Sequence, residues 1–167
     1  MPRQFDVTTA TSATVAQVHL AFADETYWSD RLMAYGGGSI TLDSLVVGER
    51  SVLVATTQDL RNDVLPALIA KAIPGDLKVV REETWRFVNG GELRGDVVIT
   101  ASGAPLSGVA TAVVRPTEDG ALLRFAGTVQ MKVPLIGGQI EKYISSQITE
   151  EIPEVQRFTT RWISEHD

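Results

Sequence analysis

The chain of 167 residues contains no cysteine and only two histidines, His19 and His166. Without cysteine there is no disulfide framework and no thiolate metal site. A zinc site would have to rely almost entirely on carboxylates, so we predict no bound metal and no cofactor. His166 is the penultimate residue and is expected to be frayed, whereas His19 lies among apolar residues, as a core or boundary histidine does.

Positive charge is also in short supply. The formal net charge is −6, the isoelectric point is about 4.9, and the lysines and arginines form no run along the sequence. Because an acidic surface repels phosphate backbones, we predict that the protein has no nucleic-acid partner.

Long apolar runs are absent as well. The uncharged segment 97–114 approaches the length of a membrane span, but Pro105 and the turn-forming sequence "SGAPLSG" divide it. We interpret it as two strands joined by a hairpin, and we predict no transmembrane segment. The N-terminal sequence "MPRQFDVTTA" has no apolar stretch of signal-peptide length. Together with the missing cysteines, this favours a cytoplasmic location.

The start of the chain predicts one strand and two short helices. The sequence "RQFDVTT" (3–9) alternates as a strand does. In residues 15–22, apolar side chains recur at helical spacing, and Ser12 or Thr14 can cap the start of that helix. The sequence "ETYWSDRLMA" (25–34) predicts a second short helix that ends at the following glycines.

The middle of the chain is rich in β-branched residues. It predicts six antiparallel strands between Ser39 and Val133, with turns at "VGER", "NGG", "SGAPLSG" and "TEDG". The segment "VLPALIAKAI" (64–73) interrupts them with a short helix that Asp63 can cap and that Pro74-Gly75 ends. We favour a structural crossover helix there, and a lid over an apolar ligand is the alternative.

The C-terminal segment from Leu135 onward predicts one long amphipathic helix. Its apolar residues recur every three or four positions as far as Trp162. Pro153 lies inside this pattern and is expected to kink the helix or to split it in two. The order of elements predicts an α+β fold: a single domain, residues 1–167, in which a seven-stranded antiparallel sheet is covered by the terminal helix.

This element order resembles that of the START-like, or Bet v 1-like, helix-grip superfamily (SRPBCC). The most telling local match is "TSATVAQVHLAFADETYWSDRL", and the resemblance covers nearly the whole chain. More narrowly, "YWSDRL", "ETWRF" and "VPLIGGQIE" resemble an uncharacterised bacterial branch of the superfamily that carries a domain-of-unknown-function label. The resemblance implies a strongly curved sheet that grips the C-terminal helix, with an apolar cavity between them.

Members of this superfamily bind lipids, sterols, polyketides or hormones, and some are cyclases or hydrolases. Since the superfamily has no universal catalytic motif, the resemblance carries over no catalytic residue. It implies that the chain binds a small apolar or amphipathic ligand, such as a lipid or polyketide. Two alternatives stay open: an enzyme of cyclase or hydrolase type that uses Glu83, His19 or Tyr143 as acid or base, and an interaction or stress-associated module without a ligand.

The sequence "VPLIGGQIEKYI" (133–144) raises the question of a phosphate-binding loop. A Walker loop needs G-x-x-x-x-G-K-[ST] after a parallel strand. Here Gly137 and Gly138 are adjacent, and Lys142 is followed by Tyr143 instead of serine or threonine. We therefore interpret the glycines as a bend between the last strand and the terminal helix. The serines lie in no G-x-S-x-G elbow, which disfavours a Ser–His mechanism.

Polar residues also occur on an otherwise apolar strand face, where Arg81 and Glu83 alternate with Trp85 and Phe87. If this face lines the cavity, the two charges either clamp a ligand headgroup or form an internal ion pair near the rim of the sheet, and we favour the ion pair. Contact with a membrane surface and the oligomeric state stay open. The predicted ligand-binding residues are Trp28 and Tyr35 near the mouth, Arg81, Glu83, Trp85, Phe87 and Phe125 on the sheet, and Gln139, Ile140 and Tyr143 on the terminal helix.

Overall fold

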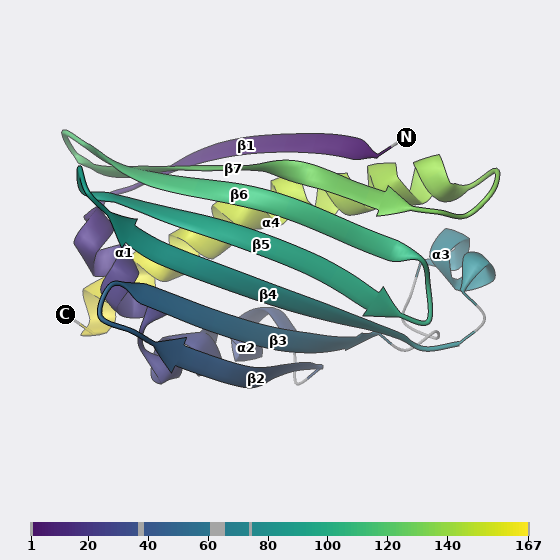
Figure 1. The fold of residues 1–167 in the computed structure, drawn as a ribbon, viewed down its shortest axis with the longest axis horizontal. Helices are drawn as coiled ribbons and strands as arrows, with labels where there is room; N and C mark the ends of the chain where they lie inside the picture. The colour runs from purple at the N-terminus through teal and green to yellow at the C-terminus, as the bar shows by residue number, and fades with distance from the viewer. Residues whose placement is uncertain (1, 37–38, 61–65, 74, 167) are drawn as a thin grey trace.

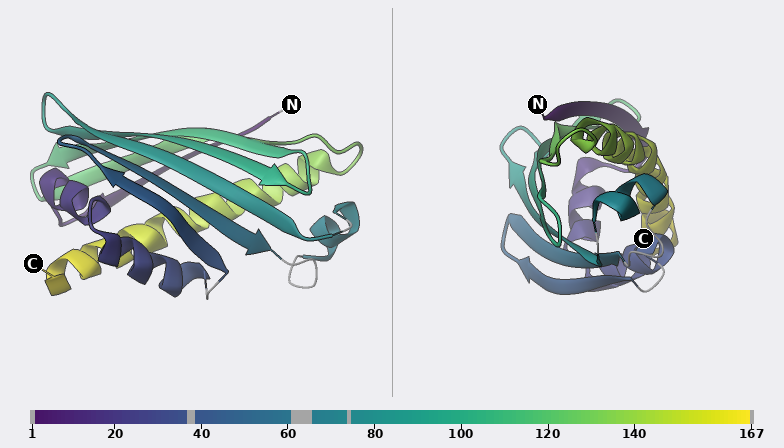
Figure 2. Two further views of the ribbon diagram at one scale, coloured as in Figure 1. Left: turned by 60° about the horizontal axis from the view of Figure 1, so that its bottom comes forward. Right: turned by 90° about the vertical axis from the view of Figure 1, so that its right-hand side faces the viewer.

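The computed structural model describes residues 2–36, 39–60, 66–73 and 75–166. A seven-stranded antiparallel sheet curves around one long C-terminal helix (Figure 1). The other views show the sheet wrapping partly round this helix, with the shorter helices gathered toward the two ends (Figure 2). The predicted α+β helix-grip architecture is confirmed.

The N-terminal strand and two helices lie where the sequence predicts them. β1 (Arg3–Thr11) is followed by α1 (Val15–Phe22) and α2 (Glu25–Gly36). Thr14, one of the two predicted caps, accepts a hydrogen bond from the Gln17 backbone N–H at 3.1 Å, and the Gln17 side chain accepts one from the Thr14 backbone N–H at 2.9 Å. This capping box satisfies two N–H groups that a helix start leaves unpaired.

The remaining strands form an antiparallel meander. The sheet order is β1-β7-β6-β5-β4-β3-β2, so the N-terminal strand pairs with the last strand of the chain. The predicted turn sequences lie between the strands. The strands are β2 (Ile40–Val47), β3 (Ser51–Leu60), β4 (Leu77–Val88), β5 (Glu92–Ser102), β6 (Leu106–Thr117) and β7 (Gly120–Met131).

A short helix, α3 (Ala67–Ala72), lies between β3 and β4, as predicted. Pro66 is its N-cap residue, while the predicted cap Asp63 and the predicted stop at Pro74 lie outside the described residues. Ile69 and Ile73 are buried against the sheet and the start of the terminal helix. In the end-on view, α3 lies across one end of the molecule, between the sheet and that helix (Figure 2).

The terminal helix, α4 (Gly137–His166), differs from the prediction at its start. It begins after Leu135, because Leu135 has a φ of 72°, in the left-handed region that a regular helix does not use. Of the two outcomes predicted at Pro153, a kink or a split, the split does not occur, because α4 continues through the proline. Ile152, directly before the proline, and Val155, two residues after it, are both buried, so packing holds the helix together where proline removes one hydrogen bond.

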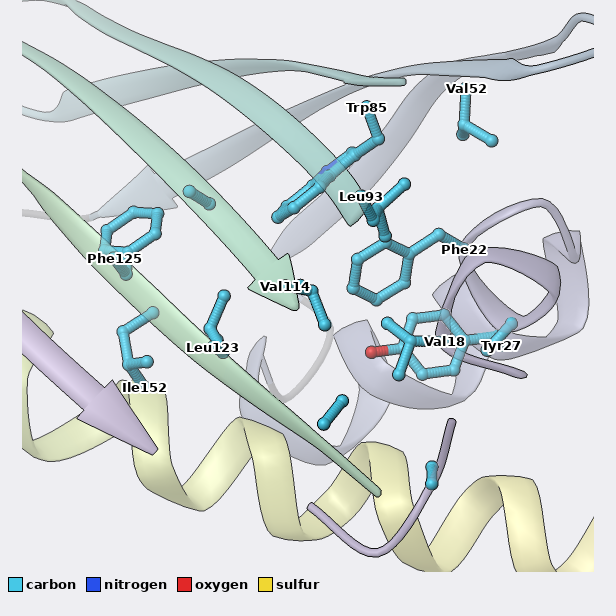
Figure 3. Packing of buried hydrophobic residues seen from close by; sticks show 14 of the residues in the cluster. Val18, Phe22, Tyr27, Val52, Trp85, Leu93, Val114, Leu123, Phe125 and Ile152 are labelled. Carbon is cyan, nitrogen blue, oxygen red and sulfur yellow. The ribbon is translucent and has the colours of Figure 1, made fainter. Parts of the chain in front are cut away.

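The core consists of two clusters of buried side chains. The larger lies beneath α1, α2 and the second half of α4, and aromatic rings fill much of it (Figure 3). Within it Trp85 lies over Gly95, where an added Cβ would come within 2.7 Å of the indole ring. The smaller cluster lies at the α3 end and is aliphatic: Ile69, Ile73, Leu77, Leu106, Val129, Met131 and Ile140.

Candidate functional site

A cavity of about 390 Å³ lies where the two clusters meet. Phe5 and Trp28 of the larger cluster and Ile69 and Leu77 of the smaller one share its wall. The volume falls toward the lower end of the range of small-molecule sites, roughly 300–1,000 Å³. The sheet contributes a mainly apolar surface: Leu77, Val79, Ile99, Leu106, Val129 and Met131.

The mouth of the cavity lies between α4 and the end of β3. Tyr143, Gln147 and Glu151, on successive turns of α4, are exposed or half-buried and also line the cavity. Gln58 and Leu60 of β3 face them from the other side and are half-buried. A ligand would therefore enter past α4, with polar side chains at the opening and apolar ones inside.

The polar centre of the wall is formed by Arg81, Glu83 and Trp85, which alternate along β4 and so point to the concave face. Glu83 is only 3% exposed, and its Oε1 accepts a hydrogen bond from the Trp85 indole N–H at 3.0 Å. Its Oε2 lies 3.0 Å from Arg81 Nε in an ion pair. The predicted pair exists, in the middle of the strand and not at the rim of the sheet.

The Arg81 guanidinium is only partly satisfied. Its Nε–H is not aligned for a hydrogen bond to Glu83, although the two groups are in ion-pair contact. No acceptor among the described residues bonds its two terminal nitrogens, and the group lies 5.9 Å from the centre of the Phe125 ring. Arg81 therefore presents free N–H donors to the cavity, backed by an aromatic face.

A second cation, Arg31 of α2, lines the same cavity. Its guanidinium lies 4.8 Å from the centre of the Trp28 ring, and Nη1 donates to the Tyr27 hydroxyl at 3.4 Å. Burial lowers the pKa of Arg31, but the negative charges of Tyr27 and Glu83 together raise it by more. The pKa of Arg31 therefore lies above its usual value. The cavity thus holds two cationic groups around one buried carboxylate.

Five of the ten predicted ligand-binding residues line this cavity. Trp28, Tyr35, Arg81, Glu83 and Tyr143 do so. Trp85 and Phe125 belong to the packed core, Phe87 packs at its edge, Gln139 is exposed, and Ile140 is fully buried in the smaller cluster; none of these five is part of the described wall. Whether any of the ten contacts a ligand stays a prediction.

Trp28 lies deeper than the predicted mouth, whereas Tyr35 lies nearer the surface. Trp28 is 1% exposed, and its indole N–H donates to the Phe22 carbonyl at 2.7 Å. The half-buried Tyr35 hydroxyl donates to the Glu154 carbonyl at 2.9 Å. Burial and the nearby Glu154 carboxylate raise the pKa of Tyr35, which keeps this donor protonated. Both residues connect α2 to its neighbours and line the cavity.

The sequence reasoning missed several polar residues of the wall, among them Arg31, Thr56, Gln58 and Gln147. Thr56 and Gln58 continue the alternation of buried residues along β3, so the period of the strand could have identified them. Arg31 follows Trp28 by three residues and therefore shares its face of α2. Nothing in the composition of these segments marks their residues as ligand contacts.

The two histidines lie away from the cavity. His19 packs against the Phe87 ring at 5.4 Å, its Nδ1 has no hydrogen-bond partner among the described residues, and burial lowers its pKa. His19 and Glu83 therefore do not converge on a common point. His166 is not frayed: its ring stacks on Trp162 at 4.0 Å, and Nδ1 lies 2.8 Å from the Trp162 carbonyl oxygen.

The glycine pair before the terminal helix has a packing role. Both Gly137 and Gly138 lie in the first turn of α4, and the positive φ of this connection belongs to Leu135. A Cβ on Gly137 would collide with the carbonyl oxygen of Met131, whereas Gly138 faces open space. Glu141 then reaches back from α4 and accepts a hydrogen bond from the Met131 backbone N–H at 2.8 Å. The bend is tight because strand and helix are in direct contact.

Within the described ranges, no helix is both long enough and apolar enough to cross a bilayer. The family model described as "Protein of unknown function (DUF2505)" matches residues 6–163. Uncharacterised proteins of Mycobacterium tuberculosis (Rv0481c) and Mycobacterium bovis (Mb0491c) are 35% identical to the chain over 171 residues, which cover 98% of this chain and 98% of each relative.

Solved structures share the fold at low sequence identity. The protein TTHA0849 from Thermus thermophilus superposes with a TM-score of 0.62 at 12% identity, over 99% of both chains. Ara h 8.0201 gives 0.55 at 9% identity, also over 99% of both chains. Dicamba monooxygenase bound to 3,6-dichlorosalicylic acid gives 0.58 at 10% identity, over 99% of this chain and 50% of that one. The predicted resemblance is thus confirmed: the chain belongs to the DUF2505 family and has a Bet v 1-like helix-grip fold.

Proposed function

We propose that the protein binds one small amphipathic molecule whose apolar body fills the cavity and whose anionic end meets Arg81. The observation that carries this proposal is the guanidinium of Arg81, which lines a mainly apolar cavity and whose buried Nε–H has no hydrogen-bond partner among the described residues. A buried donor without a partner is unfavourable, so a ligand that supplies acceptors gains from satisfying it.

An acidic group suits this position best. Arginine presents a planar fork of donors that matches the two oxygens of a carboxylate. Arg31 adds a second positive charge, while Glu83 is already held by Arg81 and by the Trp85 indole. A ligand carboxylate inside the cavity would approach two cations and one engaged carboxylate, while Glu151 lies at the mouth, and this arrangement favours an anion in the interior.

The size and lining of the cavity supply the rest of the binding energy. Burial of apolar ligand surface contributes about 25 cal/mol per Å², and a volume of about 390 Å³ suits a single small ligand. The enzyme alternative finds less support, because His19 lies outside the cavity and Glu83 is bound by two neighbours. No observation favours catalysis over binding.

The proposal is tested with delipidated protein and a ladder of saturated fatty acids and the corresponding alcohols. We expect acids of intermediate length to bind in titration calorimetry, and to bind better than the alcohols of equal length. In Arg81→Met the preference for the acid should fall by about tenfold, the effect of losing one charge-assisted pair. Arg86→Met is the matched control, because Arg86 lies on the same strand but faces solvent in a pair with Asp96.

Two results would overturn the proposal. One is that neither acids nor alcohols bind the wild-type protein at any chain length. The other is that acids and alcohols of equal length bind equally well, or that Arg86→Met changes the preference as much as Arg81→Met. Native mass spectrometry of protein purified from its own host, without added ligand, gives an independent check on the class of molecule it carries.

A further inference from the structure

All four lysines of the chain lie at one end of the molecule. Lys71 is on α3, Lys78 at the start of β4, Lys132 directly after β7 and Lys142 near the start of α4. Each lysine is within two residues of a member of the smaller core cluster, where these four segments pack together. The same segments meet at the right-hand end of the view in Figure 1.

The four lysines are exposed and carry no ion pair with a described residue. All five ion pairs of the described part use arginine. The carboxylates described near the lysines are Asp59, Asp76 and Glu141, and Glu141 is buried and bonded to the Met131 N–H. Asp59 lies opposite Lys78 in the sheet, so the four lysines exceed the three carboxylates by one and give this end a small excess of positive charge in a chain of net charge −6.

Between Lys132 and Lys142 lies the least protected apolar side chain of the described residues. Leu135 is 100% exposed and has a φ of 72°. A bulky residue in the left-handed region is strained, and an exposed leucine gains nothing from burial in the isolated protein. Neither property helps the protein to fold, and backbone strain of this kind concentrates at functional sites.

We propose that this end of the molecule docks on a membrane surface rich in anionic lipids. Leu135 enters the headgroup–acyl boundary, and Lys71, Lys78, Lys132 and Lys142 contact the lipid phosphates. An exposed apolar side chain with lysines nearby binds a membrane interface in two ways. The apolar side chain inserts among the lipids, and the lysines are attracted to the anionic headgroups. The acidic remainder of the chain is repelled by the same surface, which orients the approach.

A membrane fits these residues better than a protein partner does. The lysines lie at the same end as one fully exposed leucine, whereas a specific protein interface needs a broader apolar patch. Lysine also acts as a mobile point charge that tolerates a fluid layer of phosphates. Tyr143 at the mouth of the cavity follows Lys142 directly, so docking at this end brings the mouth near the membrane surface.

The experiment uses delipidated full-length protein and sedimentation with vesicles of phosphatidylcholine, with and without phosphatidylglycerol. We expect binding at least about fivefold stronger when phosphatidylglycerol is present, falling as salt increases. Lys132→Glu/Lys142→Glu should abolish the difference between the two vesicle types. Leu135→Asn should weaken binding by about tenfold, the effect of one buried apolar side chain.

Leu135→Asn also separates docking from folding. Asparagine adopts the left-handed region more readily than leucine, so this variant should unfold at the same or a higher temperature than the wild type. Two matched controls should leave vesicle binding unchanged. Leu20→Asn removes another exposed leucine, 68% exposed on α1 at the opposite end, and Arg115→Glu/Arg157→Glu makes the same change in net charge away from the lysines.

The proposal is wrong if the wild-type protein binds neither vesicle type, which would leave a protein partner as the use of this surface. It is also wrong if Leu135→Asn binds as well as the wild type, or if the control variants lose as much binding as the variants at the lysine end. Because no cavity ligand is present, these outcomes do not depend on whether the cavity binds an acid.

Discussion

The two ends of the sheet enclose interiors of different character. Under α1, α2 and the second half of α4, aromatic rings pack against one another, with Phe22 and Trp85 centred 4.8 Å apart and Tyr27 and Trp162 5.3 Å apart. At the α3 end, the described members of the smaller cluster are all aliphatic. The cavity lies where the rings stop, because aliphatic side chains do not fill the space between a curved sheet and a helix.

The difference extends to the polar groups. At the aromatic end, the Tyr27 hydroxyl pairs with Thr159 at 2.6 Å and the Trp162 indole with Asp30 at 2.9 Å. In the cavity, the terminal nitrogens of Arg81 find no partner among the described residues.

The aromatic end also holds unpaired atoms, since His19 Nδ1 and Gln156 Nε2 have no hydrogen-bond partner among the described residues. These atoms lie outside the cavity wall, whereas Arg81 lines it, and an unsatisfied donor that faces a hollow is a place for a ligand. We infer that the aromatic end mainly supports the fold, whereas the proposed ligand site lies between the two ends, with a wall that both clusters share.

Truncating one large side chain at each end tests this division. We expect Trp85→Ala to lower the free energy of unfolding by about 4 kcal/mol, because it leaves a void under α1 and over Gly95. Ile69→Ala, at the wall of the existing cavity, should cost only about 2 kcal/mol, since Ile69 already lacks neighbours on one side. Urea unfolding measures both, and equal losses would contradict the division.

The sequence predicted the elements well because each carried a local signal. The period of Leu77, Arg81 and Trp85 assigned them to one face of β4, and the capping box at Thr14 was readable from residue types. The start of α4 could not be predicted, because nothing in the sequence shows that Leu135 adopts a positive φ. Pro153 was overestimated as a helix breaker because packing of Ile152 and Val155 is a tertiary effect.

Glu83 connects the two ends, because it accepts from Trp85 and pairs with Arg81. Glu83→Gln keeps an acceptor for the indole but removes the charge that faces Arg81. We expect a loss of about 1–2 kcal/mol in unfolding free energy, less than for a fully buried pair because Arg81 is 28% exposed. The same variant should bind fatty acids more tightly in calorimetry. Weaker acid binding would mean that Glu83 itself contacts the ligand.

Cavity residues were harder to predict than core residues, for a physical reason. An apolar residue on the concave face either fills the core or lines a hollow, and the outcome depends on the curvature of the sheet. Trp85 and Phe125 share the concave face with Arg81 and Glu83, yet the first two are packed into the core and the last two line the cavity. The alternation of residues along a strand shows which face of the sheet a side chain is on. It does not show which side chains of other elements pack against it.

A smaller effect is expected from the hydroxyl that joins α2 to α4. Tyr27→Phe removes the hydrogen bond to Thr159 while keeping the ring. One such bond contributes about 1 kcal/mol, and the unfolding midpoint in urea should fall accordingly at an unchanged slope. Tyr143→Phe is the control, since Tyr143 is exposed at the mouth and its hydroxyl should matter by less than about 0.5 kcal/mol. A similar loss in both variants would mean that the buried bond between Tyr27 and Thr159 stabilises the protein no more than an exposed hydroxyl does.

The smallest effect belongs to His19, at the edge of the aromatic end. Burial lowers its pKa in the folded protein below the value of 6.5 that it has when exposed. The unfolded chain therefore binds the proton better, so the contribution of His19 to stability is complete above about pH 6.5 and is lost as the pH falls through its lower folded pKa. His19→Leu lacks this pH-dependent contribution. On acidification the wild type should therefore lose more unfolding free energy than the variant does. Parallel curves from about pH 7.5 to about pH 5 would show that His19 remains as accessible to protons in the folded protein as in the unfolded chain.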